Sequence, residues 1–317
     1  MERLNAFFPQ TELKQLWNLI NQAKTFALLG HKDPDRDTIF SCLAMAEVLG
    51  RLGKKVEIIF PEKPNFKIKS EYGIILYGKH SFVPEVLMFF DIACPDRAYG
   101  PKAFESVQQI INIDHHISNS VPGKLNFVDP NASSACEVLA RILFNVCKEA
   151  VVPTVAQNLL IGLLDDSIIF KTSQSSASSL ETALKLIESG ADFAKAKKIV
   201  SGHRSVDQVK NWARLISIGQ HNHKKSLFLI SVDQTMGFEI SSLEGLVNFI
   251  SGIIDCDIIA LLIEIPFTGE IKGSLRSKYS DVCALAQKFG GGGHHCAAGF
   301  RAKGTLSAIT QELLEAI

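Results

Sequence analysis

The chain has 317 residues, of which 46% are apolar and 21% are charged. This balance is typical of a packed globular protein and excludes a largely disordered chain, and the length predicts about two domains. Basic and acidic residues number 33 each. No net charge therefore attracts long polyanions, and any contact with nucleic acid has to come from a local site.

The cysteines and the apolar segments indicate the cellular compartment. The seven cysteines are odd in number, scattered, and never spaced as CxxC. This usage predicts reduced thiols and a cytoplasmic protein. Residues 1–22 have the pattern of an amphipathic helix and not that of a signal peptide. The longest apolar runs, such as 258–263, fall far short of the ~20 residues that cross a bilayer, so no membrane span is expected.

From residue 26 onward, short apolar runs alternate with helical patterns. The runs at 26–29, 56–60, 86–90 and 110–113 predict strands, and the segment 40–52 predicts a helix. This order predicts an α/β fold whose mainly parallel sheet is flanked by helices on both faces. Ligands of open α/β sheets bind outside the carboxyl ends of the strands, so polar residues that follow these runs are candidates for a site.

Helical patterns continue through the middle of the chain. One helix is expected after Pro130, where Ser134 and Glu137 have capping-box spacing. Another, over 155–164, leads to Asp165 and Asp166.

A polar helix over 207–220 and a turn-like stretch at 221–225 predict a domain boundary. Beyond it, the pattern predicts strands at 227–232, 258–265 and 271–275, and helices at 243–253, at 282–289 and from 306 onward. This is the pattern of a smaller α/β domain with a mixed sheet. We therefore expect one domain at 1–190, a helical linker at 191–223 and a second domain at 224–317.

Potential metal ligands are densest directly after the first predicted strand. His31, Asp33, Asp35 and Asp37 fall within seven residues, too many for all of them to be core. Carboxylates suit hard divalent ions, and an imidazole among them shifts the preference from magnesium or calcium toward manganese, iron or zinc. An acidic helix N-cap with solvated neighbours is the simpler explanation of this segment alone.

Two further strand ends have the same chemistry. Asp91 follows the third predicted strand, and Asp114, His115 and His116 follow the fourth. A carboxylate after a strand is common, whereas adjacent histidines there are rarer. Because side chains alternate along extended backbone, we expect the histidines to reach different partners, one a metal and the other a substrate oxygen. Asp114 is then a candidate acceptor for an imidazole N–H.

The Asp-His-His tripeptide at 114–116 matches the signature of the DHH phosphoesterases. The H-x-x-P-D-x-D pattern at 31–37 resembles the first motif of that family, and Asp91 and the segment 162–167 resemble its second and fourth motifs. The resemblance extends over almost the whole chain, with the motifs in the family's order. The G-x-x-x-D spacing within 162–167 favours Asp166 over Asp165 as the fourth-motif carboxylate.

A glycine-rich segment near the C-terminus supports the same resemblance. Residues 290–294 and 297–299 resemble the GGGH-x-x-A-A-G loop of the associated DHHA1 domain, and the strand before them contains Arg276. Glycines let backbone N–H groups approach an anion closely. The resemblance implies that the loop binds substrate from across a cleft between the domains, through Arg276, Gly291, Gly292, Gly293 and His294. A flexible turn with a solvated histidine is the simpler explanation of four glycines in isolation.

Within the family, the two-domain form is similar to the nanoRNase, phosphoadenosine-phosphate phosphatase and cyclic-dinucleotide phosphodiesterase group of the RecJ-like superfamily. The resemblance implies a hydrolase of phosphate esters with two Mn²⁺ ions, for which Mg²⁺ or Co²⁺ can substitute. The implied metal ligands are His31, Asp35, Asp37, Asp91, His115 and Asp166, with Asp91 as the bridge. The implied catalytic residues are His116, which would contact a phosphate oxygen, together with Asp114 and Asp37.

Five positions depart from the family pattern. Arg36 and Phe40 stand where small residues are usual, and Asp33 stands where asparagine is frequent. Ile168 and Ile169 stand where a glycine and a polar residue often follow the fourth-motif aspartate. These departures change the bulk and the charge close to the inferred metals. Substrate size and rate are therefore less constrained by the sequence than metal binding is.

The expected substrates are a small nucleotide or a short single-stranded oligonucleotide, with no long duplex and no membrane partner. A manganese inorganic pyrophosphatase is a rival, although the GGGH-type loop argues against it. A catalytically weak nucleotide-binding or regulatory protein is another, suggested by the crowding from Arg36, Phe40 and Ile168. A processive exonuclease is disfavoured because the chain lacks extra domains and net positive charge. The polarity of cleavage and the formation of a homodimer stay open.

Overall fold

The computed structural model describes residues 8–64, 66–172, 174–202, 205–243 and 245–317. The chain divides into two compact units, Met1–Gly202 and His203–Ile317, and each is described by itself. The predicted N-terminal helix is present as α1 (Gln10–Gln22), while its first seven residues lie outside the described ranges. Among the described residues, no helix is both long and apolar enough to span a bilayer.

The first unit is built on a six-stranded parallel sheet with the order β3-β2-β1-β4-β5-β6. Its strands are β1 (Thr25–Leu29), β2 (Lys55–Phe60), β3 (Ile74–Tyr77), β4 (Val86–Phe90), β5 (Gln109–Asp114) and β6 (Leu125–Val128). Strand β4 is buried along its whole length. A parallel strand covered on both faces needs apolar side chains on both, which explains the continuous apolar run in the sequence.

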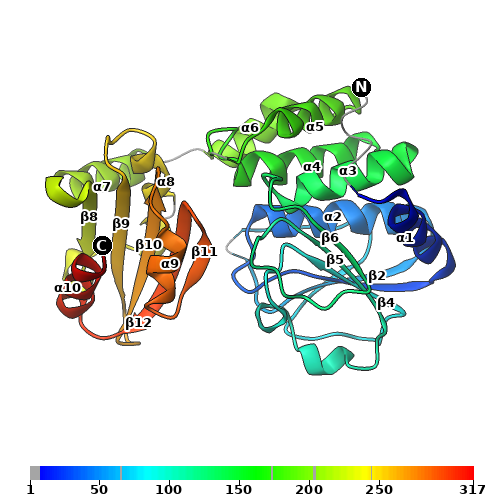
Figure 1. Cartoon of the computed structure of the whole chain (residues 1–317), viewed down its shortest axis with the longest axis horizontal. Helices are drawn as coiled ribbons and strands as arrows, with labels where there is room; N and C mark the ends of the chain where they lie inside the picture. The colour runs from blue at the N-terminus through cyan, green and yellow to red at the C-terminus, as the bar shows by residue number, and fades with distance from the viewer. Residues whose placement is uncertain (1–7, 65, 173, 203–204, 244) are drawn as a thin grey trace. The chain divides into compact units, whose positions relative to one another are not determined.

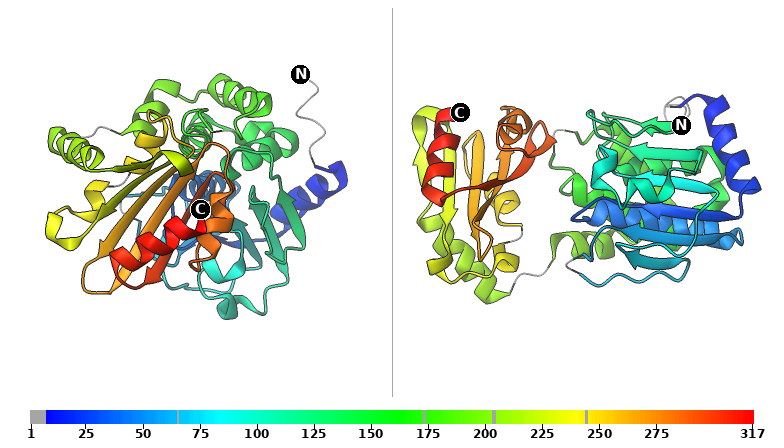
Figure 2. Two further views of the ribbon diagram at one scale, coloured as in Figure 1. Left: turned by 60° about the vertical axis from the view of Figure 1, so that its left-hand side comes forward. Right: turned by 90° about the horizontal axis from the view of Figure 1, so that it is seen from below.

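Helices cover one face of this sheet (Figure 1). Besides α1, the helices on this side are α2 (Arg36–Arg51), α3 (Ala135–Val146), α4 (Pro153–Asp166), α5 (Ala177–Glu188) and α6 (Phe193–Ser201), of which α2 and α3 contact the strands and α5 and α6 form an outer layer. Phe26, Leu28 and Met88 of the sheet share one buried core with α2, α3 and α4. Helix α4 lies beside α2, with α5 and α6 packed against it, as the views in Figures 1 and 2 show.

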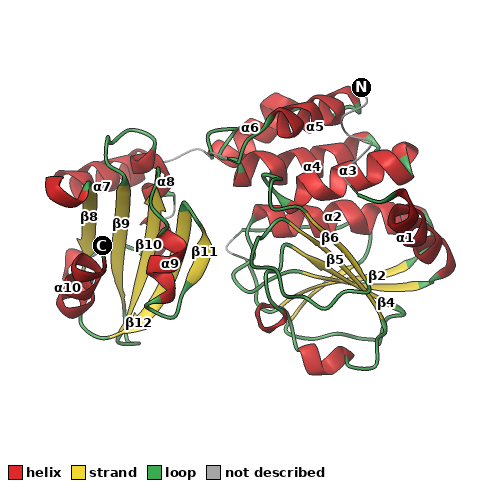
Figure 3. Cartoon of the chain, viewed as in Figure 1, coloured by secondary structure: helices red, strands yellow, loops and turns green. Residues whose placement is uncertain are grey.

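The opposite face of the sheet carries no α-helix among the described residues, so the expectation of helices on both faces was wrong. Leu29 and Phe89 point to that face and pack against the connection from β4 to β5. This connection forms two short 3₁₀ turns, Pro95–Arg97 and Pro101–Phe104, with loops around them (Figure 3). A proline begins each turn, at the position where its missing N–H costs no helical hydrogen bond.

The second unit is built on a mixed six-stranded sheet with the order β11-β12-β10-β9-β8-β7, in which only β8 and β9 pair in parallel. The strands are β7 (Gln220–Asn222), β8 (Leu227–Val232), β9 (Ile258–Ile265), β10 (Glu270–Ser277), β11 (Gly292–His294) and β12 (Ala297–Lys303). The helices are α7 (Val206–Ser217), α8 (Leu246–Ser251), α9 (Val282–Gln287) and α10 (Leu306–Ala316). Alternate residues of β8 face two cores, Leu229 with α9 and α10, and Phe228 with α7 and α8.

The predicted fold class is confirmed in both units. The helix expected over 243–253 is shorter, because a 3₁₀ turn at Ile240–Leu243 precedes α8 and Gly245, at φ 83°, stands at the N-cap of α8. The short strands β3, β6 and β7 were not predicted. The domain boundaries at 190 and 223 stay a prediction.

Candidate metal centre

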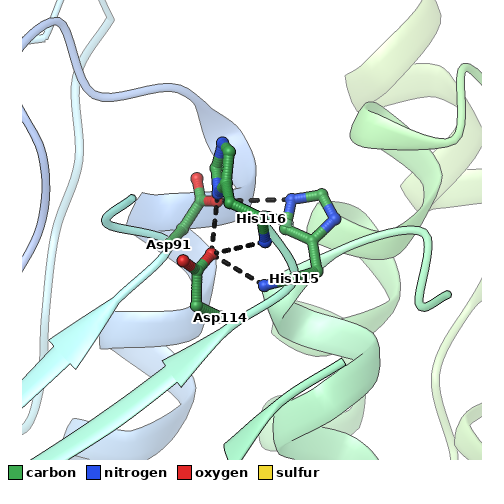
Figure 4. A group of neighbouring side chains, drawn as sticks. All are labelled: Asp91, Asp114, His115 and His116. Carbon is green, nitrogen blue, oxygen red and sulfur yellow. Dashed lines mark hydrogen bonds and ion pairs between the residues drawn. The ribbon is translucent and has the colours of Figure 1, made fainter. Parts of the chain in front are cut away.

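The polar residues that follow β1, β4 and β5 lie together at one edge of the first sheet. His31 comes just after β1, Asp91 directly follows β4, and Asp114 ends β5. Because β4 pairs in parallel with both β1 and β5, the carboxyl ends of the three strands lie side by side. Figure 4 shows the side chains of Asp91, Asp114 and His116 pointing toward one another. The convergence expected from the strand ends is therefore found.

Asp91 lies at the centre of this group. Its Oδ1 is 3.4 Å from both His115 Nε2 and His116 Nδ1, and its Oδ2 is 3.3 Å from His31 Nε2. Oδ1 is buried and forms no hydrogen bond with any described residue. The backbone of Asp91 has φ 57°, a left-handed conformation that costs free energy in a residue other than glycine. A buried carboxylate oxygen held in this way is suited to a cation.

Asp37, His115 and Asp166 form a second group, whose ligand atoms all lie within 4.8 Å of one another. His115 Nε2 is 3.2 Å from Oδ2 of Asp166, the last residue of α4. Asp37 accepts hydrogen bonds from the backbone amides of Ala135 (2.6 Å) and Cys136 (2.9 Å) at the start of α3. Three helices and one strand therefore meet at this group.

His31, Asp35 and Asp91 form a third group. Asp35 is the N-cap of α2 and accepts a 3.0 Å hydrogen bond from the amide of Thr38. Its Oδ2 lies 3.6 Å from His31 Nε2, and the carboxyl group is half exposed. The predicted metal ligands are therefore all close together. One of the two groups contains Asp91, and the other contains His115, whose Nε2 lies 3.4 Å from Asp91 Oδ1.

Backbone carbonyls orient the two histidines of these groups. His31 Nδ1 donates to the carbonyl of Lys32 (2.6 Å), and His115 Nδ1 faces the carbonyl of Ala132 at 3.3 Å. The Nε2 atom of each ring then faces the carboxylates. A neutral imidazole held through Nδ1 presents the Nε2 lone pair, which is the form that binds metals.

Asp114 holds the third histidine. Its Oδ1 accepts hydrogen bonds from His116 Nδ1 and from the amide of His115, both at 2.7 Å, as the dashed lines in Figure 4 show. Its Oδ2 accepts a hydrogen bond from the side-chain amide of Asn119. Asp114 is fully buried, so these contacts fix both its position and the orientation of His116.

Two of the four clustered carboxyl groups, those of Asp37 and Asp166, have raised pKa values in the metal-free protein. Burial, and then the charge of Asp91, raises the pKa of Asp37 to about 7. Burial on its own lowers the pKa of His31, but the carboxylates of Asp35 and Asp91 outweigh it and raise the pKa to about 10. Burial also raises the pKa of Asp166 well above its usual range. When no metal is bound, protons on these groups therefore supply the positive charge that balances the carboxylates.

The residues present fit a pair of divalent cations. Four carboxylates would carry a formal charge of −4, which two divalent ions would neutralise, and Asp91 Oδ1 forms no hydrogen bond with any described residue. Carboxylate oxygens together with imidazole nitrogens are a donor set that suits manganese, iron or zinc. The four carboxylates are those of Asp35, Asp37, Asp91 and Asp166.

Asp165 and Asp166 have different surroundings. Asp166 lies among the candidate ligands, whereas Asp165 Oδ1 accepts a 3.0 Å hydrogen bond from Nη1 of Arg36. Arg36, at the first position of α2, is therefore joined to the C-terminal end of α4. It neutralises the carboxylate that lies next to a candidate ligand.

The chain turns sharply after Asp166. Ile168, Ile169 and Phe170 have φ angles of 49°, 56° and 62°, so three consecutive residues are left-handed. This conformation costs about 1–2 kcal/mol for each residue that has a Cβ. The strain begins at Ile168, where the family resemblance leads one to expect a glycine, two residues after a candidate metal ligand.

The glycine run of the second unit packs closely against β12. A Cβ on Gly291 would lie 2.2 Å from the carbonyl oxygen of Gly299, and the amide of Gly291 donates to Ala286 at the end of α9. Gly293 has φ 147° and equally little room, whereas a Cβ on Gly292 would meet no atom within 4 Å. Packing therefore explains two of these glycines, and their binding of substrate stays a prediction.

Two side chains, those of Arg276 and His294, were predicted to bind substrate. Arg276, on β10, donates from Nε to Asn248 Oδ1 at 2.8 Å and from Nη1 to the carbonyl of Leu275. The side chain of His294 lies outside the described part of the chain. The role of both residues in binding substrate stays a prediction.

A buried ion-pair network behind the site was missed in the sequence. Arg141 pairs with Asp129 at 2.8 Å and with Glu137, and all three side chains are buried. Ser134 caps α3 as expected, but the carboxylate of Glu137 accepts from Ser133 instead of returning to the N-cap. Asp129 directly follows β6, so the strand-end signal that identified Asp91 applied here as well. The network holds the segment whose Ala132 carbonyl orients His115.

Residues 25–163 match the model of the DHH family, N-terminal domain, and residues 231–317 match that of the DHHA1 domain. The bifunctional oligoribonuclease and PAP phosphatase NrnA of Thermus thermophilus is 27% identical over 297 residues, 90% of this chain and 87% of that protein. A probable manganese-dependent inorganic pyrophosphatase of Shouchella clausii is 24% identical over 173 residues, 51% of this chain and 53% of that protein. The crystal structure of an exopolyphosphatase-related protein from Bacteroides fragilis has a TM-score of 0.84 at 22% identity and covers 97% of this chain and 96% of its own.

The two domain models match separate units of the chain, and the shared fold extends over nearly all of it. The chain therefore belongs to the DHH family, in the form that carries a DHHA1 domain, and it is a phosphoesterase of that family.

Proposed function

We propose that this chain is a two-metal manganese phosphoesterase that hydrolyses short oligoribonucleotides or small nucleotides such as phosphoadenosine phosphate or a cyclic dinucleotide. The main observation behind the proposal concerns Oδ1 of Asp91. This oxygen is buried, accepts no hydrogen bond from any described residue, and faces His115 and His116. The similarity to a protein named oligoribonuclease and PAP phosphatase supports this substrate class. The similarity to a protein named a probable manganese-dependent pyrophosphatase supports manganese.

The ligands divide between two ions around Asp91. His31 and Asp35 would hold one ion and Asp37, His115 and Asp166 the other, with Asp91 shared between them. Two bound divalent ions would supply a water of lowered pKa and positive charge next to the phosphate oxygens.

His116 and Asp114 are proposed to act on the substrate as a pair. Asp114 Oδ1 accepts from His116 Nδ1, which fixes the ring, and Nε2 is then a donor in the doubly protonated imidazolium, whose positive charge the Asp114 carboxylate balances. We assign Nε2 to a non-bridging phosphate oxygen, where a fixed donor stabilises the charge that develops during hydrolysis. Asp37, whose pKa is about 7 without metal, would release its proton when a cation binds.

The second unit is proposed to bind the part of the substrate that does not react. Arg276, Gly291, Gly292, Gly293 and His294 are the residues assigned to this role. The proposed boundaries are a catalytic domain at 1–190, a helical linker at 191–223 and a substrate-binding domain at 224–317. The seven free cysteines fit a protein of the reducing cytoplasm.

The test is manganese-dependent turnover by the purified full chain. The substrate panel comprises RNAs of two to five nucleotides, cyclic di-AMP, phosphoadenosine phosphate and pyrophosphate. His115→Ala serves as the inactive variant, and His80→Ala, which changes a histidine outside the centre, as its matched control. Turnover of a nucleotide substrate that is lost only in His115→Ala supports the proposal.

Two results would contradict it. Turnover of pyrophosphate alone would identify an inorganic pyrophosphatase. Bound manganese without turnover of any substrate would indicate a nucleotide-binding regulatory protein, as the crowding by Arg36 and Phe40 suggests.

A further inference from the structure

A cavity of about 500 Å³ lies within the first unit, outside the candidate metal centre. Its walls come from α2, α4, α6 and the segment 66–72 that leads toward β3. This volume is within the range of about 300–1,000 Å³ that is typical of small-molecule sites. The cavity is lined only by residues of the first unit.

One wall of the cavity is aromatic and apolar. Phe40 and Leu43 lie three residues apart on α2, so they share one face of that helix. The ring of Phe66 lies opposite the guanidinium of Arg36, whose Cζ is 5.2 Å from the ring centroid. Phe40 and Phe66 are both partly exposed, so a planar ring can stack on them.

The rim of the cavity is basic. Lys67, Lys69 and Lys195 line it, and their ammonium groups form no hydrogen bond or ion pair with any residue that the structure describes. Of the two acidic residues in the lining, Glu47 already pairs with Arg51 at 2.8 Å. With Arg36, the lining holds four cations against two carboxylates, a formal excess of +2. Such a rim favours an anionic ligand.

One polar side chain of the cavity is suited to a base edge. Asn158 of α4 is partly buried and lines the cavity, and its amide forms no hydrogen bond with the described residues. An amide offers both a donor and an acceptor, as the edge of a nucleobase does. The side-chain amide of its neighbour Gln157 already forms two hydrogen bonds with the backbone of Asp192. Its Nε2 donates to the carbonyl, and its Oε1 accepts from the N–H.

We propose that this cavity is a nucleotide-binding site separate from the metal centre, and that it takes a nucleoside phosphate. The base would lie against Phe40 and Phe66, and the phosphate would be bound by the three lysines of the rim. Inorganic phosphate would leave the aromatic wall unused, and an apolar ligand would leave the cations unused. Aromatic stacking combined with cationic contacts to phosphate is how proteins hold single nucleotides without reading a sequence.

Arg36 places this site beside the metal centre. Its guanidinium lines the cavity and also bonds to Asp165, the neighbour of the candidate ligand Asp166. Because a change of Arg36 would affect both places, it is not a suitable variant for the test. Lys67 and Lys69 are exposed, and among the described residues no ion pair involves them, so their replacement preserves the fold.

The experiment is calorimetric binding of adenosine 5′-monophosphate to the full chain in EDTA, so that metal-held phosphate does not contribute. Lys67→Glu combined with Lys69→Glu should weaken binding by about tenfold or more, and Phe66→Ala by a similar factor through lost stacking. The matched control Lys63→Glu, an exposed lysine outside the cavity, should have no effect. Asp91→Asn should also bind normally, which separates this site from the proposed active site.

Four results would overturn the assignment. The first is no binding of the nucleotide in EDTA. The second is binding that survives both the double lysine variant and Phe66→Ala. The third is binding that is lost in Arg276→Ala or Asp91→Asn but kept in those cavity variants, because the nucleotide would then lie in the second unit or at the metal centre. Inorganic phosphate that binds as tightly as the nucleotide would likewise exclude a role for the aromatic wall.

Discussion

The hydroxyl of Thr38 donates a 2.6 Å hydrogen bond to Oδ2 of Asp91, joining the first turn of α2 to the end of β4. Both residues are buried. This hydrogen bond occupies one carboxylate oxygen of Asp91, a residue whose backbone is left-handed. Oδ1 is then turned toward His115 and His116, where it forms no hydrogen bond with the described residues.

Thr38→Val should weaken manganese binding. Valine keeps the shape of threonine but lacks the hydroxyl, so Asp91 loses the bond that sets its orientation. Loss of such a supporting contact typically costs about 10–100-fold in metal affinity. Isothermal titration with manganese measures the change, and Thr38→Ser, which keeps the hydroxyl, should bind nearly as the wild type does. Equal affinity in the valine variant would show that the bond does not position Asp91.

Asp165 and Asp166 should respond differently to replacement by asparagine. Asp166→Asn should remove one manganese ion per chain, because this carboxylate lies 3.2 Å from His115 Nε2 among the candidate ligands. Asp165→Asn should leave the stoichiometry unchanged, because that side chain bonds to Arg36. Metal analysis after dialysis distinguishes the two variants. Loss of an ion in Asp165→Asn alone would reverse the assignment.

Manganese affinity should rise with pH. Burial and Asp91 raise the pKa of Asp37 from 3.8 to about 7, and Asp35 and Asp91 outweigh burial to raise that of His31 from 6.5 to about 10. Both values are raised on folding. The resulting stabilisation of the metal-free protein is therefore complete below the unfolded values and is lost as the pH rises through about 7 and about 10.

A cation has to displace the same protons, so its affinity should gain up to about tenfold per pH unit for each proton released. The measurement is the melting temperature with EDTA and with manganese between pH 6 and pH 9. The increase in melting temperature caused by manganese should grow with pH. A constant or shrinking increase would contradict the protonated state of the metal-free site.

Gly291→Ala should destabilise the second unit, whereas Gly292→Ala should not. A Cβ at Gly291 would lie 2.2 Å from the carbonyl of Gly299, while at Gly292 no atom lies within 4 Å. Forcing a methyl group into packed backbone costs about 1–3 kcal/mol or more, which lowers the melting temperature by several degrees. Calorimetry of the two variants gives the comparison. Equal melting temperatures would mean that Gly291 does not pack closely on Gly299 and Phe300 of β12.

Arg141→Met should be among the most damaging single changes in the first unit. It would leave the buried carboxylates of Asp129 and Glu137 without their shared cation, and breaking a buried pair costs about 3–5 kcal/mol. Denaturant unfolding measures this loss. The control Lys185→Met breaks a partly exposed pair with Glu181 and should cost less than about 0.5 kcal/mol. A similar small loss in Arg141→Met would mean that the network adds no stability.

The sequence predicted the centre of the first unit because its strands are buried on both faces. β1 and β4 contain unbroken apolar runs and β5 contains one interrupted only by Asn112, and each is followed within two residues by a polar side chain of the site. β3 and β6 have only four residues each, and β3 is partly exposed at the edge, so neither differs clearly from a loop in the sequence. Asp129 was missed together with β6.

Sequence patterns did not predict the contacts between segments that are distant in the chain. The capping-box spacing correctly placed the start of α3 at Ser134, but the carboxylate of Glu137 is drawn to Ser133 and Arg141 by burial. The hydrogen bond from Thr38 to Asp91 joins residues 53 positions apart, and nothing local marks it. The pairing of Arg36 with Asp165 likewise depends on α2 lying beside α4.

The measurement that tests the two-metal centre most directly is anomalous X-ray diffraction at the manganese edge from crystals of the full chain grown with manganese. The account predicts two peaks about 3.5–4 Å apart, with Asp91 in contact with both, His31 beside one and His115 beside the other. A single peak, or two peaks that do not share Asp91, would contradict it.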